Sequence, residues 1–257
     1  MTFRSALVTG ASSGIGEAIA RFLPVGTDLL LQGRDEGRLA AVAASVARSG
    51  RRIETVAIDL AKPGAAEALA ERGLAFGVDL LVNNAGIGRA GRFDRNAPDA
   101  EAEMVTVNVL APVVVTRALL PGMLDRAHAG GGRAGLIIVS SIAGFGPVPF
   151  LTTYAATKAF DLRFAEGLAE ELRREPIDVL ALCPGGTETR FAERAGSGRN
   201  GAHSAERVAR EGLEALGKRR VHVVGAGNQA ITMAFKLLPG RLMAALAARS
   251  VSTSSKG

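Results

Sequence analysis

Cysteine, histidine, tyrosine and tryptophan are scarce in this sequence, and their scarcity excludes several classes of protein. Cys183 is the single cysteine, so no disulfide can form within the chain, and only three histidines accompany it. Neither the number of cysteines nor the number of histidines supports a structural zinc site, and we expect no metal. Tryptophan is absent, and Tyr154 is the only tyrosine. A chain that has no disulfide is expected to be cytoplasmic.

Charge of one sign is not concentrated in any long run, although the formal net charge is +6. Arginines are scattered among Asp and Glu along helical stretches, and the short basic run at 218–220 is typical of a solvated helix end. Aromatic residues make up only 4% of the chain, so few side chains could stack on bases. We therefore expect no nucleic-acid partner.

No hydrophobic run has the content of a membrane-spanning segment. Residues 135–157 are free of Asp, Glu, Lys and Arg and are long enough to cross a bilayer. Pro147 and Pro149 interrupt this stretch, however, and serines, threonines and a tyrosine make it polar. Near the N-terminus, glycines and serines interrupt the apolar run after Val8, so no secretory signal is expected either.

Short apolar segments alternate with longer helical patterns along the chain. The predicted strands, rich in Val, Ile and Leu without strict alternation, cover residues 6–8, 28–32, 53–58, 80–82, 136–140, 178–183 and 221–224. The predicted helices cover residues 14–23, 36–48, 64–72, 99–126, 153–174 and 204–216. No linker divides the chain, and the Ser/Thr-rich tail 250–257 is expected to be disordered. The sequence therefore predicts one α/β domain over residues 1–257, a three-layer doubly wound fold with a mainly parallel seven-stranded sheet.

A glycine-rich turn, Thr9-Gly10-Ala11-Ser12-Ser13-Gly14-Ile15-Gly16, follows the first predicted strand and precedes a helix. Glycine lets a backbone approach a pyrophosphate closely, and the helix N-terminus presents amides and a favourable dipole to the anion. An ordinary tight turn is the simpler alternative, but the order of strand, turn and helix favours a dinucleotide.

Tyr154 and Lys158 lie four residues apart at the start of a predicted helix, so their side chains share one face. A lysine cation nearby favours the phenolate of a tyrosine, whose ordinary pKa is near 10. Tyr154 could therefore give a proton to a carbonyl or take one from an alcohol. Ser141, at the end of a strand, could position the same oxygen; Ser140 competes for this role but points to the opposite face.

The chain resembles the short-chain dehydrogenase/reductase family over residues 4–191. The resemblance is carried by the T-G-x-x-x-G-x-G spacing of the turn, by Asn83-Asn84-Ala85-Gly86, by Asp59, by Pro184-Gly185 and by the Y-x-x-x-K pair. It implies a compact Rossmann fold, an NAD(P)-dependent oxidoreductase acting on CH–OH or C=O groups, and a homodimer or homotetramer.

The resemblance also assigns residues. It implies the catalytic set Asn108, Ser141, Tyr154 and Lys158. It further implies that phosphates are cradled by Gly10, Ser12, Ser13, Gly14 and Ile15, and adenine by Asp59 and Leu60. The resemblance implies that Asn83, Ala85 and Gly86 line the adenine ribose. It implies that the nicotinamide half is bound by Pro184, Gly185, Thr187 and Thr189, and that Tyr154 and Lys158 also contact the cofactor.

Cofactor choice depends on the end of the second predicted strand, which reads Leu31-Gln32-Gly33-Arg34. NAD preference calls for a carboxylate here to bind the ribose 2′-OH. Gly33 stands at that place, and the guanidinium of Arg34 suits a 2′-phosphate. We therefore predict NADP(H), with NAD(H) as the alternative because Asp35 could reach the ribose if the strand register shifted by two residues.

Two further segments are expected to shape the substrate site. Residues 144–151 are apolar, which suggests an apolar carbonyl or alcohol substrate, and 190–203 should form a loop over it. Residues 228–249 read as two helices separated by Pro239-Gly240. We expect them to pack over the cleft or against a partner subunit rather than on a membrane surface.

A protein of a different class also fits the fold: a dinucleotide sensor or scaffold that has lost its chemistry. The intact Tyr154–Lys158 pair favours the enzyme, since a sensor needs no proton donor.

Overall fold

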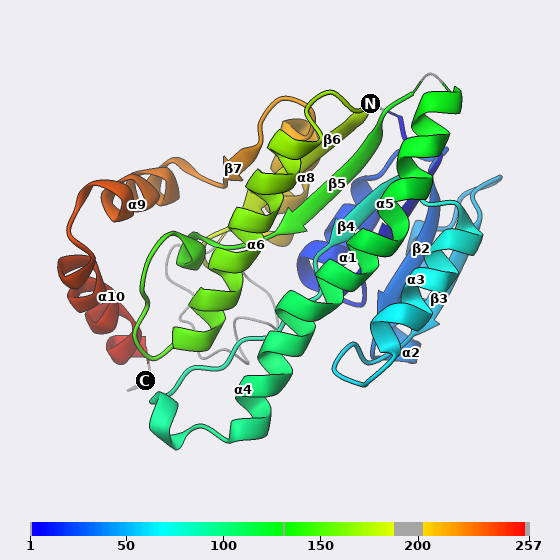
Figure 1. Cartoon of the computed structure of the whole chain (residues 1–257). Coiled ribbons are helices and arrows are strands. Elements are labelled where there is room, and N and C mark those ends of the chain that lie inside the picture. Colours follow the sequence, from blue (N-terminus) through cyan, green and yellow to red (C-terminus); the bar gives the residue numbers. More distant parts are fainter. Residues whose placement is uncertain (1, 131, 188–202, 255–257) are drawn as a thin grey trace.

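The computed structural model describes residues 2–130, 132–187 and 203–254. Seven strands form one parallel sheet in the order β3-β2-β1-β4-β5-β6-β7 (Figure 1). Their bounds are β1 (Ser5–Val8), β2 (Asp28–Gly33), β3 (Ile53–Ala57), β4 (Leu80–Asn83), β5 (Ala134–Val139), β6 (Ile177–Cys183) and β7 (Val221–Val223). The predicted fold class, a doubly wound sheet, is confirmed. The order reverses between β1 and β4, and a cleft for ligands is expected at such a point.

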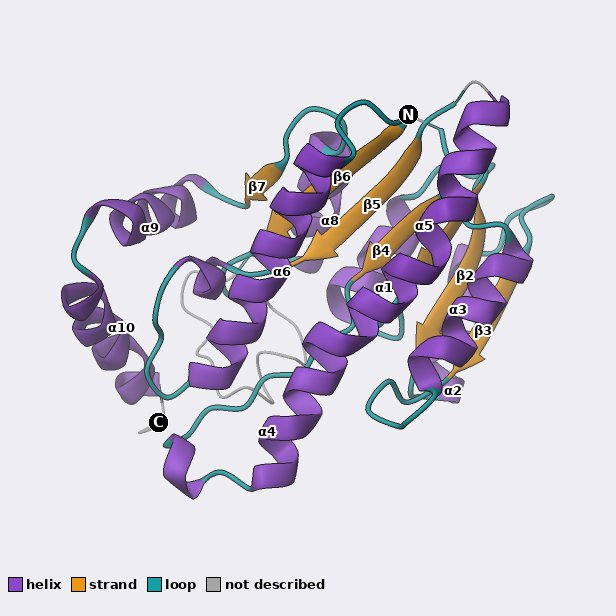
Figure 2. Cartoon of the chain, in the orientation of Figure 1, coloured by secondary structure: helices purple, strands orange, loops and turns teal. Residues whose placement is uncertain are grey.

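Helices cover both faces of the sheet (Figure 2). The helices α1 (Gly14–Phe22), α2 (Glu36–Val46) and α8 (Ala205–Ala215) pack in one hydrophobic cluster. The other face is covered by α3 (Ala65–Phe76), α5 (Ala111–Gly130) and α6 (Thr152–Glu171), which contribute to a second cluster.

Successive strand residues enter different clusters, which explains why the strands do not alternate between polar and apolar. In β1, Ala6 and Val8 belong to the first cluster and Leu7 to the second. In β2, Leu29 and Leu31 face one way and Leu30 the other. A strand buried on both faces needs apolar residues at every position.

The predicted helix 99–126 is a longer helical stretch with an irregular turn in its middle. It comprises α4 (Pro98–Val105), a π-helical turn (Thr106–Leu110) and α5. By length and composition this stretch, Pro98–Gly130, could cross a membrane, and its most apolar window has a mean hydropathy of 1.6. The expectation that no segment has the content of a membrane span is therefore wrong for this helix. Such a property is shared by core helices, and α5 packs against α3 here.

The C-terminal segment forms two helices at one end of the molecule, α9 (Ala226–Leu237) and α10 (Gly240–Ser254) (Figure 1). The break between them falls at Pro239, as predicted. The expectation of a disordered tail from residue 250 is wrong for 250–254, which continue α10, because the serines and threonines there extend a helix begun by alanines and leucines. Residues 255–257 lie outside the described part of the chain.

Candidate active site

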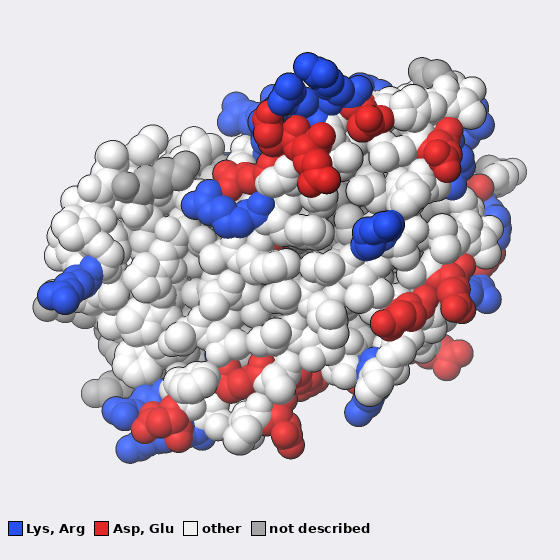
Figure 3. Space-filling model, viewed as in Figure 1, with Lys and Arg blue, Asp and Glu red and all other residues white. Residues whose placement is uncertain are grey.

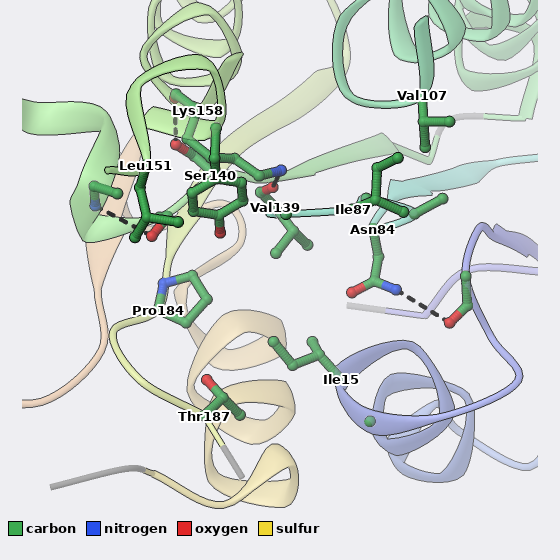
Figure 4. A pocket seen from close by; sticks show the side chains of 18 of the residues that line it. Ile15, Asn84, Ile87, Val107, Val139, Ser140, Leu151, Lys158, Pro184 and Thr187 are labelled. Atoms are coloured by element: carbon green, nitrogen blue, oxygen red, sulfur yellow. Dashed lines mark hydrogen bonds between the residues drawn. The ribbon is translucent and has the colours of Figure 1, made fainter. Parts of the chain in front are cut away.

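A cavity of about 990 Å³ opens at the carboxyl ends of the strands, where β1 and β4 meet. Figure 4 shows Asn84 and Ile15 toward one end of it and Lys158 and Ser140 toward the other, with Pro184 and Thr187 along one wall. Most of the predicted site residues line this cavity: Gly10, Ser12, Ser13, Gly14, Ile15, Arg34, Asp59, Leu60, Ala85, Gly86, Ser141, Tyr154, Lys158, Pro184, Gly185 and Thr187.

The glycine turn is shaped for close approach. Gly10 and Gly14 have φ values of +64° and +61°, a region that glycine adopts without steric cost. A Cβ on Gly16 would lie 2.5 Å from the carbonyl oxygen of Gly10, so the first turn of α1 can approach Gly10 this closely only with glycine at position 16. Ser13, Gly14 and Ile15, at the start of α1, line the cavity, so a helix N-terminus is available there to a pyrophosphate.

Two polar side chains hold this turn in place, and the sequence analysis overlooked both. The Gly10 amide donates to Gln32 Oε1 at 3.0 Å, while Gln32 Nε2 donates to the carbonyl of Ile58 at 2.8 Å. Thr9 Oγ1 accepts hydrogen bonds from the amides of Asn84 and Ala85, each at 2.9 Å. A buried glutamine in an apolar strand was the available signal, since such an amide needs partners.

The two asparagines of the Asn83-Asn84 pair point in different directions. Asn83 is buried at the end of β4 and donates to Thr116 Oγ1 at 2.8 Å. Asn84 lines the cavity and donates from Nδ2 to the carbonyl of Thr9 at 2.9 Å. The structure therefore does not bring the Asn83 side chain to the predicted ribose site, because alternation along the strand turns it toward α5.

Basic side chains stand at the end of β2, where the adenine ribose is expected. Arg34 is 46% exposed at the cavity rim and lies 3.9 Å from Glu103. Arg38, one turn into α2, lines the same rim and was not among the predicted residues. Asp35 caps α2 by accepting from the Arg38 amide at 3.0 Å, and its other oxygen pairs with the Arg38 side chain at 3.1 Å. The carboxylate is thus occupied locally.

Asp59 and Leu60 follow β3 at the same end of the cavity. The Asp59 carboxylate accepts from the amide of Ala61 at 3.2 Å, which fixes the turn after the strand. Leu60 is buried and presents an apolar surface there. Both residues line the cavity, and their contact with adenine stays a prediction of the resemblance.

Ser140 and Ser141 take different partners, as the alternation along β5 predicts. The Ser140 hydroxyl is buried and donates to the backbone carbonyl of Lys158 at 2.7 Å, so it fastens α6 to the sheet. Ser141 Oγ accepts from the amide of Ala143 at 3.1 Å and hydrogen-bonds Tyr154. Ser141 is therefore the serine that shares the cavity with the phenol.

Burial raises the pKa of Tyr154, and this effect outweighs the lowering by the Lys158 cation and the Ser141 hydrogen bond. The lysine acts on the phenol in the predicted direction, but the phenol stays protonated in the protein alone. A protonated phenol beside a serine hydroxyl is arranged to donate to a carbonyl oxygen.

Lys158 is buried and its ammonium group has two partners. Nζ donates to the carbonyl of Val139 at 2.9 Å and to Asp161 Oδ2 at 2.8 Å. Burial opposes the charge, but the carboxylate of Asp161 outweighs this effect through its charge and its hydrogen bond, so the pKa of Lys158 is raised. The lysine therefore stays a cation beside Tyr154.

Asp161 is the functional residue that the sequence analysis missed most plainly. Its side chain is 2% exposed, and burial raises its pKa against the opposing effect of Lys158. Its Oδ1 atom has no hydrogen-bond partner among the described residues. The signal was present: a carboxylate three residues after the lysine shares its helix face.

Asn108 is fully buried in the π-helical turn and fixes the loop after β4. Its Oδ1 accepts from the amide of Ile87 and its Nδ2 donates to the carbonyl of the same residue, each at 2.8 Å. Nδ2 also donates to Thr157 Oγ1 at 3.0 Å. The side chain thus connects the loop to α6 and is not among the residues that line the cavity. Irregular π turns of this kind are frequent at functional sites.

The loop after β6 forms another part of the cavity wall, through Pro184, Gly185 and Thr187. Thr187 Oγ1 donates to the carbonyl of Gly185 at 3.2 Å, and Thr187 pairs with His203 in a short bridge. Thr189 and most of the predicted loop 190–203 lie outside the described residues.

The remaining wall is apolar. Val148 and Leu151 come from the segment 144–151, as predicted, and Phe235, Met243 and Ala247 come from α9 and α10. Phe235 packs against Gly146, where no larger residue would fit. The C-terminal helices therefore do cover the cleft.

The single thiol and the histidines are apart from this chemistry. Burial raises the pKa of Cys183 to about 12, so the thiol is neutral and serves as a small core residue. His222 lies on β7, within the predicted strand 221–224, and its Nε2 atom is 2.9 Å from Glu211 Oε2. Within the described ranges, no three His, Cys, Asp or Glu side chains gather as metal ligands.

Comparison with known proteins agrees with the geometry. The sequence profile of the short chain dehydrogenase family matches residues 4–200. The chain belongs to the short-chain dehydrogenase/reductase family. It is therefore an NAD(P)-dependent oxidoreductase, and the family resemblance is confirmed.

Several relatives cover most of the chain. It is 35% identical to dehydrogenase/reductase SDR family member 7B of Rattus norvegicus, over 85% of this chain and 72% of the relative. It is 36% identical to 1-deoxy-11-beta-hydroxypentalenate dehydrogenase of Streptomyces arenae, over 86% and 81%. Among solved structures, a short-chain dehydrogenase from Sphingobium yanoikuyae in complex with NADPH is 31% identical, with a TM-score of 0.79 and coverage of 90% and 92%. One from Burkholderia phymatum in complex with NAD is 27% identical, with a TM-score of 0.78, over 90% and 92%.

The residues at the site fit such a dinucleotide. Gly10 and Gly14 line the cavity at the glycine turn, where a pyrophosphate would bind. A Cβ on Gly86 would lie 3.5 Å from Lys158 Nζ, so a larger residue there would crowd the lysine. When bound, the nicotinamide supplies or accepts the hydride. The protein contributes a proton at Tyr154 Oη, a hydroxyl at Ser141 Oγ and a fixed cation at Lys158 Nζ.

Proposed function

We propose that this protein is an NADP(H)-dependent oxidoreductase that reduces a carbonyl, or oxidises the corresponding secondary alcohol, on an apolar small molecule. The observation that carries the proposal is the placement of Ser141, Tyr154 and Lys158 beside an apolar wall. In the reduction, a hydride reaches the carbonyl carbon while Tyr154 gives its proton to the oxygen, and the alcohol results.

The preference for NADP(H) is supported by two arginines. Arg34 and Arg38 both stand at the cavity rim beyond β2. Guanidinium groups match the charge and geometry of a 2′-phosphate. The carboxylate that could favour NAD(H), Asp35, is engaged by Arg38 and by the α2 amide.

Dissociation constants for NADPH and NADH, measured by fluorescence titration, test this preference. We expect NADPH to bind more tightly, and Arg34→Ala and Arg38→Ala each to weaken NADPH binding by about tenfold while leaving NADH unchanged, since hydrogen bonds to charged groups contribute about 1.5–3 kcal/mol. Arg92→Ala, at an exposed ion pair with Asp94, is the matched control. Tighter NADH binding would refute the preference.

The substrate class is tested by a screen of apolar ketones and polar sugars for NADPH consumption. Because one wall of the cavity is apolar, we expect the apolar ketones to be turned over faster than the polar sugars. We also propose that the protein is a homodimer or homotetramer, which light scattering measures. We further propose a cytoplasmic location, with which the single cysteine is consistent.

A further inference from the structure

The helices α9 and α10 have two apolar sides. On one side, Phe235, Met243 and Ala247 line the cavity. On the other, Met233 and Leu237 are 55% and 74% exposed, and Leu238 and Leu242 are exposed as well. Ile231 and Leu246 are exposed and also line the cavity, so they stand at its edge.

This concentration of exposed apolar side chains is unlike the rest of the surface. Six of the thirteen large hydrophobic residues that are exposed in the described chain fall within residues 231–246. The other seven are spread from Phe22 to Phe160. Single exposed apolar residues are ordinary, whereas large groups of them mark sites of interaction with proteins, membranes or ligands.

The charge of the segment has one sign. No Asp or Glu follows Glu214, while Lys236, Arg241, Arg249 and Lys256 are all basic. Figure 3 agrees: the end of the molecule formed by α9 and α10 is largely white, without red. Two copies of this face would bring like charges together, which opposes self-association.

We propose that the outer face of α9 and α10 docks on an anionic lipid bilayer, with Met233, Leu237, Leu238 and Leu242 entering the interface and Arg241 facing lipid headgroups. Apolar side chains together with cations are the combination by which helices lie on such a surface. Because Ile231 and Leu246 connect this face to the cavity, an apolar substrate can reach the site from the bilayer.

Flotation of the full-length protein with lipid vesicles tests the docking independently of catalysis. We expect binding to phosphatidylcholine vesicles that contain phosphatidylserine, weaker binding to phosphatidylcholine alone, and release by salt. The double variant Leu237→Asp/Leu242→Asp should lose at least about tenfold in partitioning, since burying one leucine is worth more than a factor of ten. Arg241→Glu should weaken binding only to the anionic vesicles.

Leu74→Asp on α3 is the matched control, because Leu74 and Leu242 are both 48% exposed. It should float as the unchanged protein does, and circular dichroism melts confirm that each variant is folded. Failure of the unchanged protein to float, or equal loss with Leu74→Asp, would overturn the proposal. So would a shift of the double variant from oligomer to monomer in light scattering without any vesicle binding, since the face would then be a subunit interface.

Discussion

At the scale of single residues, the reaction depends on where charge is held around one phenol. Around Tyr154 lie the hydroxyl of Ser141, which follows β5, the ammonium of Lys158 one helical turn away and, hydrogen-bonded to that ammonium, the carboxylate of Asp161. Burial keeps the phenol neutral, while the Asp161 contact keeps Lys158 charged. The donor and the cation that stabilises its anion are thus both in the state that reduction requires.

Replacing Tyr154 by phenylalanine removes the proton donor and little else. We expect kcat for carbonyl reduction to fall by about 10²–10⁴-fold, the usual contribution of general acid catalysis. The dissociation constant for NADPH should change little, because the ring remains. Stopped-flow turnover and fluorescence titration measure the two quantities, and undiminished turnover would disprove the assignment.

Replacing Asp161 by asparagine should change the pH profile of reduction. The carboxylate raises the pKa of both Tyr154 and Lys158, and the neighbouring Cys183 thiol is neutral. In Asp161→Asn this carboxylate charge is gone, so the phenol of Tyr154 loses its proton and Lys158 loses its charge at lower pH. The alkaline limit of kcat should therefore move to lower pH.

The profile separates this role from mere support of the fold. A structural defect would lower kcat equally at every pH and leave the limit where it is. Asp94→Asn, which removes an exposed carboxylate, serves as the control for charge. An unchanged alkaline limit in Asp161→Asn would show that the carboxylate does not act through Lys158.

At the scale of elements, the site is made where strands end and helices begin. The turn between β1 and α1, the loop after β4 and the start of α6 meet because β1, β4 and β5 are neighbours in the sheet. Small residues allow this approach: a Cβ on Gly144 would lie 2.5 Å from the carbonyl of Lys158. The elements can pack at these distances only around glycine.

Gly16→Ala tests that packing at the cofactor turn. The added methyl would meet the backbone of Gly10, so we expect a loss of about 1–3 kcal/mol in the free energy of unfolding and weaker NADPH binding. Gly26→Ala, whose Cβ would have nothing within 4 Å, should change stability by less than about 0.5 kcal/mol. Urea titration compares the two, and equal stabilities would contradict the close approach.

At the scale of the whole molecule, the cofactor site draws on most strands of the sheet and therefore exists only in the folded chain. A ligand that binds only the folded state stabilises it by mass action. At a hundredfold excess over its dissociation constant, NADPH should add about 2.7 kcal/mol to the free energy of unfolding.

For a chain of this length, that gain corresponds to a rise of about 5–10 °C in Tm. Differential scanning calorimetry measures it, and NADH at the same concentration should raise Tm less. Arg34→Ala should remove most of the difference between the two cofactors. A Tm that neither dinucleotide changes would mean that the cavity is not the cofactor site.

The sequence alone determined the parts of this protein that depend on local geometry. A glycine turn between strand and helix, and two side chains four residues apart on a helix, have the same arrangement wherever the pattern occurs. The positions of the strands could equally be predicted from the sequence, since residues buried on both faces of a sheet must be apolar. These patterns predicted the sheet and placed Ser141, Tyr154 and Lys158 in one cavity.

Only the tertiary structure decided which side chains meet across elements. Arg38 joins Arg34 because one turn of α2 brings it back to the rim, and Asn83 leaves the cavity because its strand position turns it toward α5. The helices α9 and α10 complete the cavity from the far end of the chain. Such contacts depend on the packing of distant segments, and sequence spacing carries no information about the distance between their side chains.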